Sequence, residues 1–278
     1  MNDIIKSQFM REFSEIIDTM YRLGWDERNG GNVSYLLTQN EALPYLKVNQ
    51  SLGTIKLDFD AKKLSGKIFL ITGTGKYFRN LKKDPESNCG IIKINEDGWS
   101  ANILWGFKNA KGPTSEINTH LHAHIVRLQV DPNHRVVIHC HATNLLAMSF
   151  IHELDEREFT RTLWKMCTEC IIVFPEGIGL IPWMIPGNVE IGVATAKKIK
   201  ESKIVLWPMH GIFGCGDSLD DAFGLIETAE KAAEIYLKIL HYPIKREITD
   251  AELMDLSIAF GVKPKDGYLD FGGNHEKI

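Results

Sequence analysis

Hydrophobic residues recur along the chain with two different periods, which predict its helices and its strands. Between residues 4 and 23 the apolar positions are three and four apart, and Gly24 follows as a C-cap, so we expect an amphipathic helix there. A second stripe of this spacing follows Ser218, which resembles a capping pair with Asp221 and predicts a long helix. We interpret both stripes as faces that are buried in the core.

Short apolar and β-branched runs, bounded by glycines or polar residues, predict the strands. We expect strands after the glycine turn at 29–31 and at 67–72, 91–94, 102–106, 136–141, 171–174 and 203–210. Helices are expected after residue 115 and from Asn144 to Phe150, and residues 37–66 are interpreted as an irregular excursion. The elements are mixed without repeats or low-complexity linkers, and a chain of 278 residues can bury one large core or form two small domains.

Composition and charge narrow the class of protein. The sequence is 44% hydrophobic and 24% charged, as in ordinary globular proteins, and its formal net charge of −4 argues against nucleic acid as the main partner. A local basic pocket could still hold a small anion. Five cysteines do not suggest a disulfide framework, and neither a signal peptide nor an apolar run of membrane length is visible. We therefore expect a cytoplasmic protein with reduced thiols and no membrane partner.

Two histidines that alternate along one predicted strand, His139 and His141, are the strongest chemical signal. Side chains at i and i+2 of a strand point to the same face, so both imidazoles face one point while Cys140 faces the other way. A predicted helix start follows, which places the pair at the end of a strand, where active sites collect in α/β proteins. An isolated His-x-His can also simply end a strand, so a third ligand decides the interpretation.

His210 is the candidate third ligand. It ends the apolar run that begins at Lys203, and glycines follow it. Three histidines from two neighbouring strand ends would leave an open position on a bound Zn²⁺, as in catalytic sites, whereas structural zinc sites use four protein ligands. We therefore predict a catalytic metal site on His139, His141 and His210.

Two other clusters compete with this interpretation. His120 and His124 share a helix face at i, i+4 after the predicted capped start at Thr114–Ser115, while His122 points away; no further ligand stands at a matching spacing. The motif from Cys167 to Cys170 is a C-x-x-C, which can be a redox motif or half of a zinc ribbon. No second C-x-x-C is present and an apolar run follows, so core cysteines are favoured.

Three short segments are candidates for binding an anion such as a phosphate. Residues 29–32, 73–75 and 114–115 combine glycines with hydroxyl or amide side chains, and glycine lets the backbone approach an oxyanion. Each alone is more typical of a turn, and none matches the Rossmann or P-loop fingerprint.

Glu116 follows the third segment in the predicted first turn of a helix, where an acidic residue also suits the helix dipole. Its functional interpretation is a general base that removes a proton beside a carbonyl polarised by the metal.

Taken together, the motifs of this sequence resemble those of the class II aldolase/adducin superfamily. The segments that carry the resemblance follow the same order from about residue 4 to residue 262, and the tail 264–278 is unmatched. They are Gly-Trp-Asp-Glu-Arg-Asn-Gly-Gly-Asn (24–32), Gly-Thr-Gly-Lys-Tyr-Phe-Arg-Asn (73–80), Pro-Thr-Ser-Glu (113–116), His-Cys-His-Ala-Thr-Asn (139–144), Thr-Glu-Cys (168–170), Pro-Trp-Met-Ile-Pro-Gly (182–187) and Trp-Pro-Met-His-Gly-Ile-Phe-Gly (207–214).

The resemblance implies a single domain over residues 1–278 with a three-layer α/β/α fold and a mostly antiparallel central sheet, assembled as a homotetramer with active sites near subunit interfaces. It implies a zinc-dependent aldolase that reversibly cleaves a phosphorylated sugar, with one Zn²⁺ per subunit on His139, His141 and His210 and with Glu116 as catalytic acid/base. It also implies a second catalytic carboxylate, Glu169, at the aldehyde end of the substrate. The residues that would hold the substrate phosphate are Asn29, Asn32, Thr74, Thr114 and Ser115.

Two alternatives remain open within the same superfamily. A 4-epimerase uses the same retro-aldol step and re-forms the bond after rotating the aldehyde. An adducin-type binding protein keeps the fold without catalysis, and retention of the three histidines and Glu116 argues against it. From its sequence position alone, Glu169 is equally well interpreted as a solvent-facing residue beside a strand.

Overall fold

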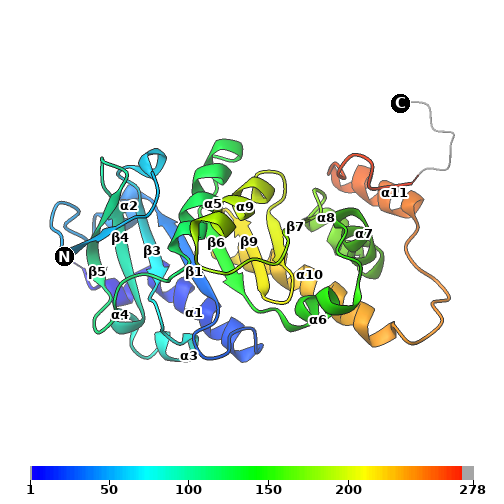
Figure 1. Cartoon of the computed structure of the whole chain (residues 1–278), viewed down its shortest axis with the longest axis horizontal. Coiled ribbons are helices and arrows are strands. Elements are labelled where there is room, and N and C mark those ends of the chain that lie inside the picture. Colours follow the sequence, from blue (N-terminus) through cyan, green and yellow to red (C-terminus); the bar gives the residue numbers. More distant parts are fainter. Residues whose placement is uncertain (1, 271–278) are drawn as a thin grey trace.

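The computed structural model describes residues 2–270 and contains one nine-stranded sheet in the order β2-β5-β4-β3-β1-β6-β9-β8-β7 (Figure 1). Every neighbouring pair is antiparallel except β7 and β8, which run parallel. The strands are β1 (Asn32–Leu37), β2 (Gly53–Lys56), β3 (Ile68–Thr72), β4 (Cys89–Ile94), β5 (Ser100–Gly106), β6 (Val136–Cys140), β7 (Ile178–Leu180), β8 (Ile204–Trp207) and β9 (Gly211–Gly216).

Helices cover both faces of this sheet. Figure 1 shows α5 and α9 on one side and α1 and α10 on the other, while α7, α8 and α11 gather beyond the β7 edge. The helices are α1 (Gln8–Arg22), α2 (Gln39–Ala42), α3 (Phe78–Leu81), α4 (Pro85–Asn88), α5 (Ile117–Val130), α6 (Thr143–Ile151), α7 (Glu156–Met166), α8 (Thr168–Val173), α9 (Val189–Ile199), α10 (Leu219–Ile239) and α11 (Asp250–Phe260), with 3₁₀ turns at Ile4–Lys6 and Lys62–Leu64. None of the helices within residues 2–270 combines the length and apolar character that a membrane span needs.

The alternation of side chains along the strands divides the core between these two helical layers. On β6, Ile138 is buried with the residues of α1 and α10, whereas its neighbour Val137 is buried on the opposite face, in the same cluster as Ala123 of α5 and Ile191 of α9. Successive side chains of a strand point to opposite faces, so an all-apolar strand such as β6 requires cover on both. The predicted three-layer α/β/α fold with a mostly antiparallel sheet is therefore confirmed.

Both long amphipathic helices are also confirmed. The first forms as a 3₁₀ turn followed by α1, and Gly24 follows its end with a φ of +76°, the left-handed conformation that glycine adopts without strain. In α10, the Ser218 hydroxyl accepts a hydrogen bond from the backbone N–H of Asp221, as the capping pair predicts. The helices expected after residue 115 and near Asn144 are present as α5 and α6.

Three parts of the predicted secondary structure are wrong. Residues 171–174 lie in and just after helix α8 instead of a strand, because a four-residue apolar run has no period of its own and here buries Cys170 and Ile171 as part of a helix. Residues 203–210 form a shorter strand, β8, which ends at Trp207. The excursion 37–66 contains α2, strand β2 and a 3₁₀ turn.

Strand β9 is absent from the sequence-based prediction, and its glycines explain why. Glycine is depleted in strands, so the run from Gly211 to Gly216 reads as a loop. A Cβ atom at Gly214 would lie 2.7 Å from the Ile226 side chain, and one at Gly216 would lie 2.6 Å from the Ala222 backbone nitrogen. The glycines therefore let α10 approach the sheet closely.

Candidate active site

The structure brings His139, His141 and His210 together at one end of the sheet. The nitrogen atoms that each could offer to a metal all lie within 4.8 Å of one another, and this is the one such group of three found within residues 2–270. His139 lies on β6, His141 just beyond it, and His210 in the tight turn between β8 and β9. Because β9 pairs directly with β6, the hairpin carries His210 alongside the other two.

Hydrogen bonds orient two of these imidazoles. The Nδ1–H of His139 donates to the backbone carbonyl of Ile212 at 3.1 Å, which leaves its Nε2 atom buried and without a hydrogen-bond partner. His141 Nδ1 lies 2.8 Å from both carboxylate oxygens of Glu27, so its Nε2 is likewise directed away. A carboxylate or carbonyl on the outer nitrogen is the usual way in which metal-binding histidines are fixed.

Burial also keeps these groups in the form that binds metal. Burial, with the neighbouring histidines, holds the pKa of His139 well below its ordinary value, and burial lowers the pKa of His210 to about 4. Metals bind the neutral imidazole, so neither side chain needs to lose a proton near neutral pH. An unpartnered buried nitrogen among three imidazoles suits a divalent ion of borderline softness such as Zn²⁺.

Two glycines make room for the imidazoles. A Cβ atom at Gly211 would lie 2.6 Å from His139 Cε1 and 2.9 Å from His141 Cδ2, and one at Gly30 would lie 2.7 Å from His141 Cε1. Such distances are far below van der Waals contact, so any larger residue would displace the rings. The glycines of the 29–32 segment and of β9 thus shape the histidine cluster.

Glu116 lies beside this cluster. Its Oε2 atom is 3.6 Å from His139 Nε2 and accepts a hydrogen bond of 3.0 Å from the Asn32 side-chain amide. It is the N-cap residue of α5 rather than a first-turn residue, and its side chain makes no capping bond. Burial raises the pKa of this carboxyl group despite the hydrogen bond from Asn32. A buried carboxylate with a raised pKa is suited to taking up and giving back a proton.

The three segments predicted to bind an anion converge near Glu116. Gly73 forms an isolated bridge with Pro113, and the Thr114 N–H donates to Thr72 O at 2.8 Å, so residues 73–75 and 113–115 lie side by side. Residue Thr72 also meets β1, because its Oγ1 accepts the N–H of Val33 at 3.2 Å.

The five predicted phosphate residues are not equally free to bind a ligand. Asn29 and Ser115 are exposed and Thr74 is partly exposed. The Thr114 hydroxyl is buried and accepts the Glu116 backbone N–H at 3.2 Å. Asn32 is buried, and its amide already contacts Glu116 and His120. The exposed hydroxyl and amide groups are therefore the ones open to an incoming anion.

Other candidate residues lie outside this cluster. Glu169 is exposed on α8, accepts a hydrogen bond from Cys167 Sγ at 2.8 Å and lines a pocket with α11 that includes none of the three histidines. Cys167 and Cys170 are free thiols. His120 and His124 point into the protein and bond to other side chains, and His122 points away and stacks on Phe59, as its helix position predicts.

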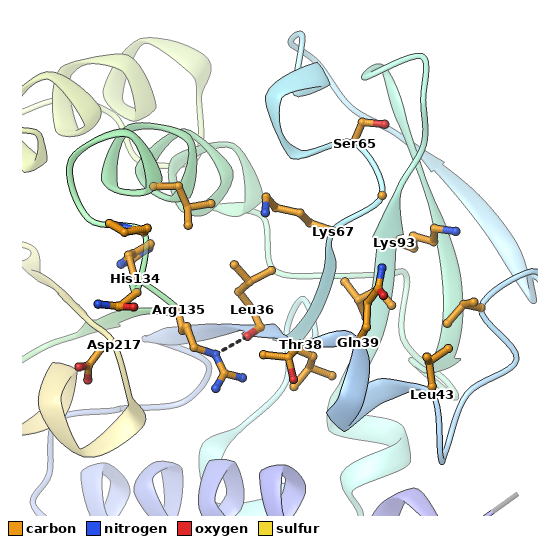
Figure 2. Close-up of a pocket in the computed structure, with 17 residues that line it drawn as sticks. Leu36, Thr38, Gln39, Leu43, Ser65, Lys67, Lys93, His134, Arg135 and Asp217 are labelled. Atoms are coloured by element: carbon orange, nitrogen blue, oxygen red, sulfur yellow. Dashed lines mark hydrogen bonds between the residues drawn. The ribbon is translucent and has the colours of Figure 1, made fainter.

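The pocket in Figure 2 lies at the opposite end of β6 from the candidate site. It has a volume of about 980 Å³ and is lined by Leu36, His134 and Arg135 among others, but by none of the three clustered histidines. Arg135 Nε donates to the Leu36 carbonyl across this wall.

Sequence reasoning misses the roles of two residues of the site. In the sequence Glu27 is only one member of a longer motif, whereas in the structure its carboxylate contacts His141. Asn32 is predicted to bind phosphate, whereas in the structure its amide contacts Glu116. These partners are 114 and 84 residues apart in the chain, so no local spacing signals either contact.

Comparisons with known proteins identify the family of this chain. Residues 11–237 match the family model described as Class II Aldolase and Adducin N-terminal domain. A rhamnulose-1-phosphate aldolase of Listeria monocytogenes is 56% identical over 96% of this chain and 98% of its own length, and one of Yersinia pestis is 45% identical over 97% and 100%. Among solved structures, a sugar-phosphate aldolase from Thermotoga maritima is 29% identical and covers 85% of this chain and 97% of its own, with a TM-score of 0.74.

The resemblance drawn from the sequence motifs is thus supported along almost the whole chain. The family model runs from within α1 to within α10 and so includes the histidine cluster, Glu116 and the converging segments. This protein belongs to the class II aldolase and adducin family.

Proposed function

We propose that this protein is a metal-dependent aldolase that reversibly cleaves L-rhamnulose 1-phosphate to dihydroxyacetone phosphate and L-lactaldehyde. The observation that carries the proposal is the arrangement of Glu116 Oε2 at 3.6 Å from His139 Nε2, within a cluster of three histidines suited to a metal. The named relatives, 45–56% identical over nearly their full length, support the choice of substrate.

His139, His141 and His210 would hold the metal, and we propose Zn²⁺ because three imidazoles with an open position match its catalytic sites. When bound, the ion supplies a Lewis acid that polarises a carbonyl or hydroxyl oxygen of the substrate. Glu27 fixes the His141 ring through its Nδ1, and the Ile212 carbonyl fixes that of His139.

Glu116 would carry the proton at carbon 3 of the ketose. In the cleavage direction, the 4-hydroxyl group loses its proton and becomes the aldehyde as the bond between carbons 3 and 4 breaks, and the Glu116 carboxyl group gives a proton to carbon 3. In synthesis the Glu116 carboxylate removes the proton from carbon 3, and the oxygen at carbon 4 takes one up. The raised pKa of the buried group favours both roles, because a catalytic acid/base works best with a pKa closer to the working pH.

Asn29, Thr74 and Ser115 would bind the phosphate with exposed or partly exposed polar groups. Thr114 would hold the neighbouring backbone, and Asn32 would hold Glu116.

The role of Glu169 at the aldehyde end stays a prediction. Within one chain Glu169 lines a pocket apart from the histidines, so this role would require a neighbouring subunit, in line with the proposed homotetramer. We also propose one domain, which is supported by the single sheet with strands from Asn32 to Gly216. A cytoplasmic location is likewise part of the proposal.

The deciding experiment is an assay of the purified protein against L-rhamnulose 1-phosphate, L-fuculose 1-phosphate and L-ribulose 5-phosphate, each with and without a chelator. We expect dihydroxyacetone phosphate and L-lactaldehyde from the first at the highest kcat/KM, and loss of turnover after chelation. Formation of an epimeric pentose phosphate without free aldehyde would instead indicate a 4-epimerase. Sugar phosphate binding with no product in any assay would indicate a binding protein.

A further inference from the structure

A chain of buried polar side chains leads from Glu116 into the interior of the protein. After the Asn32–Glu116 bond, Asn32 Oδ1 contacts His120 Nε2, and His120 Nδ1 contacts Ser34 Oγ at 2.7 Å. Ser34 Oγ lies 2.8 Å from His124 Nε2, and His124 Nδ1 lies 2.9 Å from His134 Nε2. We refer to Asn32, Ser34, His120, His124 and His134 as the histidine chain. All of them are buried, with exposures of 6% or less.

The regular spacing of the histidine chain follows from similar distances between its members along strand β1 and along helix α5. Asn32 and Ser34 are two residues apart on β1, a rise of about 6.7 Å, and His120 and His124 are four apart on α5, a rise of about 6 Å. The two pairs can therefore interleave, and the Ser34 hydroxyl bridges both imidazoles.

The hydrogen bonds of the histidine chain run in one direction. A carboxylate at Glu116 requires Asn32 to present its NH₂ group, so Asn32 Oδ1 accepts and His120 Nε2 must carry a proton. Burial lowers the pKa of His120 and of His134 to about 3, so these rings are neutral. A neutral His120 accepts at Nδ1 from the Ser34 hydroxyl, which in turn accepts from His124 Nε2–H, and His134 Nε2–H donates to His124 Nδ1.

We propose that Ser34, His120 and His124 are positioning residues for the reaction, because they hold the Asn32 amide with its N–H directed at the Glu116 carboxylate. This inference rests on the proposed function of Glu116. Without the chain, the Asn32 amide could turn its oxygen toward the carboxylate and repel it. Hydrogen bonds aligned in one direction also polarise one another, which strengthens the last bond to Glu116.

The far end of the histidine chain lies at the wall of the pocket shown in Figure 2. His134 lines that pocket, while Asn32 lies opposite His139 at the other end of the β1–β6 pair. The chain thus extends along much of this strand pair, and its outer members can be changed without touching the histidine cluster.

The test replaces Ser34 by Ala, which removes the hydroxyl that joins His120 to His124. For the metal-loaded enzyme we expect kcat to fall about tenfold, the low end of the roughly 10–100-fold range for outer partners of a site, with KM and metal content unchanged. Ser34→Thr keeps the hydroxyl and should restore most of the rate. His134→Leu, in which the outermost donor is lost, should lower kcat in the same direction, and His134→Gln should restore it. The matched control is Ser14→Ala, another buried serine, whose hydroxyl bonds only to Met10 O in α1.

A merely structural role predicts a different pattern. In that case Ser34→Ala and Ser14→Ala would both lower the melting temperature and leave kcat unchanged, which would overturn the proposal. A rise in KM with kcat unchanged would also overturn it, because this result would place Asn32 at the phosphate rather than at Glu116.

A readout independent of activity is the nitrogen NMR spectrum of the holoenzyme labelled with ¹⁵N-histidine. We expect Nε2–H tautomers for His120, His124 and His134 in the parent and a changed pattern for His120 and His124 in Ser34→Ala. Nδ1–H tautomers in the parent would overturn the inference. If the parent cleaves no ketose phosphate, the proposed function fails, whereas the direction of the histidine chain is still decided by these signals.

Discussion

Glu116 Oε2 lies 3.6 Å from His139 Nε2, although Glu116 precedes α5 and His139 lies on β6. The same nitrogen has no hydrogen-bond partner, so it is open to a metal, and the carboxylate stands directly beside it. A base within reach of the atom that polarises the substrate is the arrangement that proton transfer next to a carbonyl requires. Both members of this pair, and the groups that hold them, can be tested by substitution.

Replacing His210 by Ala should empty the metal site. Two imidazoles bind a divalent ion far more weakly than three, so we expect metal affinity to fall by more than the roughly 10–100-fold lost with an outer partner. Metal analysis after dialysis measures this. His241→Ala, an exposed histidine outside the cluster, should retain the metal. Stoichiometric metal in His210→Ala would remove this residue from the ligand set.

Glu116→Gln should leave the protein folded and metal-loaded but nearly inactive. General acid/base catalysis contributes about 10²–10⁴-fold, and Gln preserves the size of the side chain without its proton transfer. The rate is measured as exchange of a carbon-bound proton of dihydroxyacetone phosphate with deuterated water, without any aldehyde. Glu190→Gln, which alters another acidic residue at a helix start, should exchange like the parent. Parent-like exchange in Glu116→Gln would show that another group is the base.

Ser115→Ala should mainly raise KM for the phosphorylated ketose. Ser115 is exposed next to Glu116, and a hydrogen bond to a charged group contributes about 1.5–3 kcal/mol, so KM should rise roughly 10–150-fold. The exposed Ser51→Ala variant serves as the control, and the unphosphorylated ketose should be a poor substrate. A large fall in kcat with unchanged KM would place Ser115 at the reacting carbons instead.

Gly211→Ala should disrupt the metal site through steric contact alone. The new methyl group would lie 2.6 Å from His139 Cε1, so the ring must move, and we expect loss of metal and of turnover. Gly224→Ala in α10 is the matched control, because nothing lies within 4 Å of the place that its methyl group would take, and Ala favours a helix by roughly 0.5–1 kcal/mol. Full metal occupancy in Gly211→Ala would mean that the hairpin tolerates the shift.

Asp26→Asn should change the pH dependence of stability. Burial, with the Glu27 charge, raises the pKa of Asp26 to about 8, and its Oδ2 atom has no hydrogen-bond partner. Between about pH 4 and pH 8 the unfolded chain has lost this proton while the folded protein keeps it, so the parent loses stability as pH rises through this window.

The free energy of unfolding of Asp26→Asn relative to the parent should therefore increase from pH 5 to pH 8 in urea titrations. The exposed Asp255→Asn serves as the control. A constant difference between Asp26→Asn and the parent would mean that Asp26 is ionised in the folded protein.

Much of the site could be predicted from the sequence because the patterns that indicate it lie within single strands and helices. His139 and His141 share a face because a strand has a period of two, and His120 and His124 share one because a helix repeats every 3.6 residues. Long stripes such as that of α10 are equally reliable, since many positions agree on one period.

Contacts between distant segments were decided only by the tertiary structure. Glycine-rich β9 is a strand because β6 and β8 offer hydrogen bonds on both sides. Most of the apolar run at 171–174 belongs to helix α8, which packs against α7, α10 and α11. The carboxylate of Glu27 on His141 and the amide of Asn32 on Glu116 depend on the pairing of strands and the placement of α5. Local patterns determine which face a side chain takes, whereas packing of the whole fold determines which group it meets there.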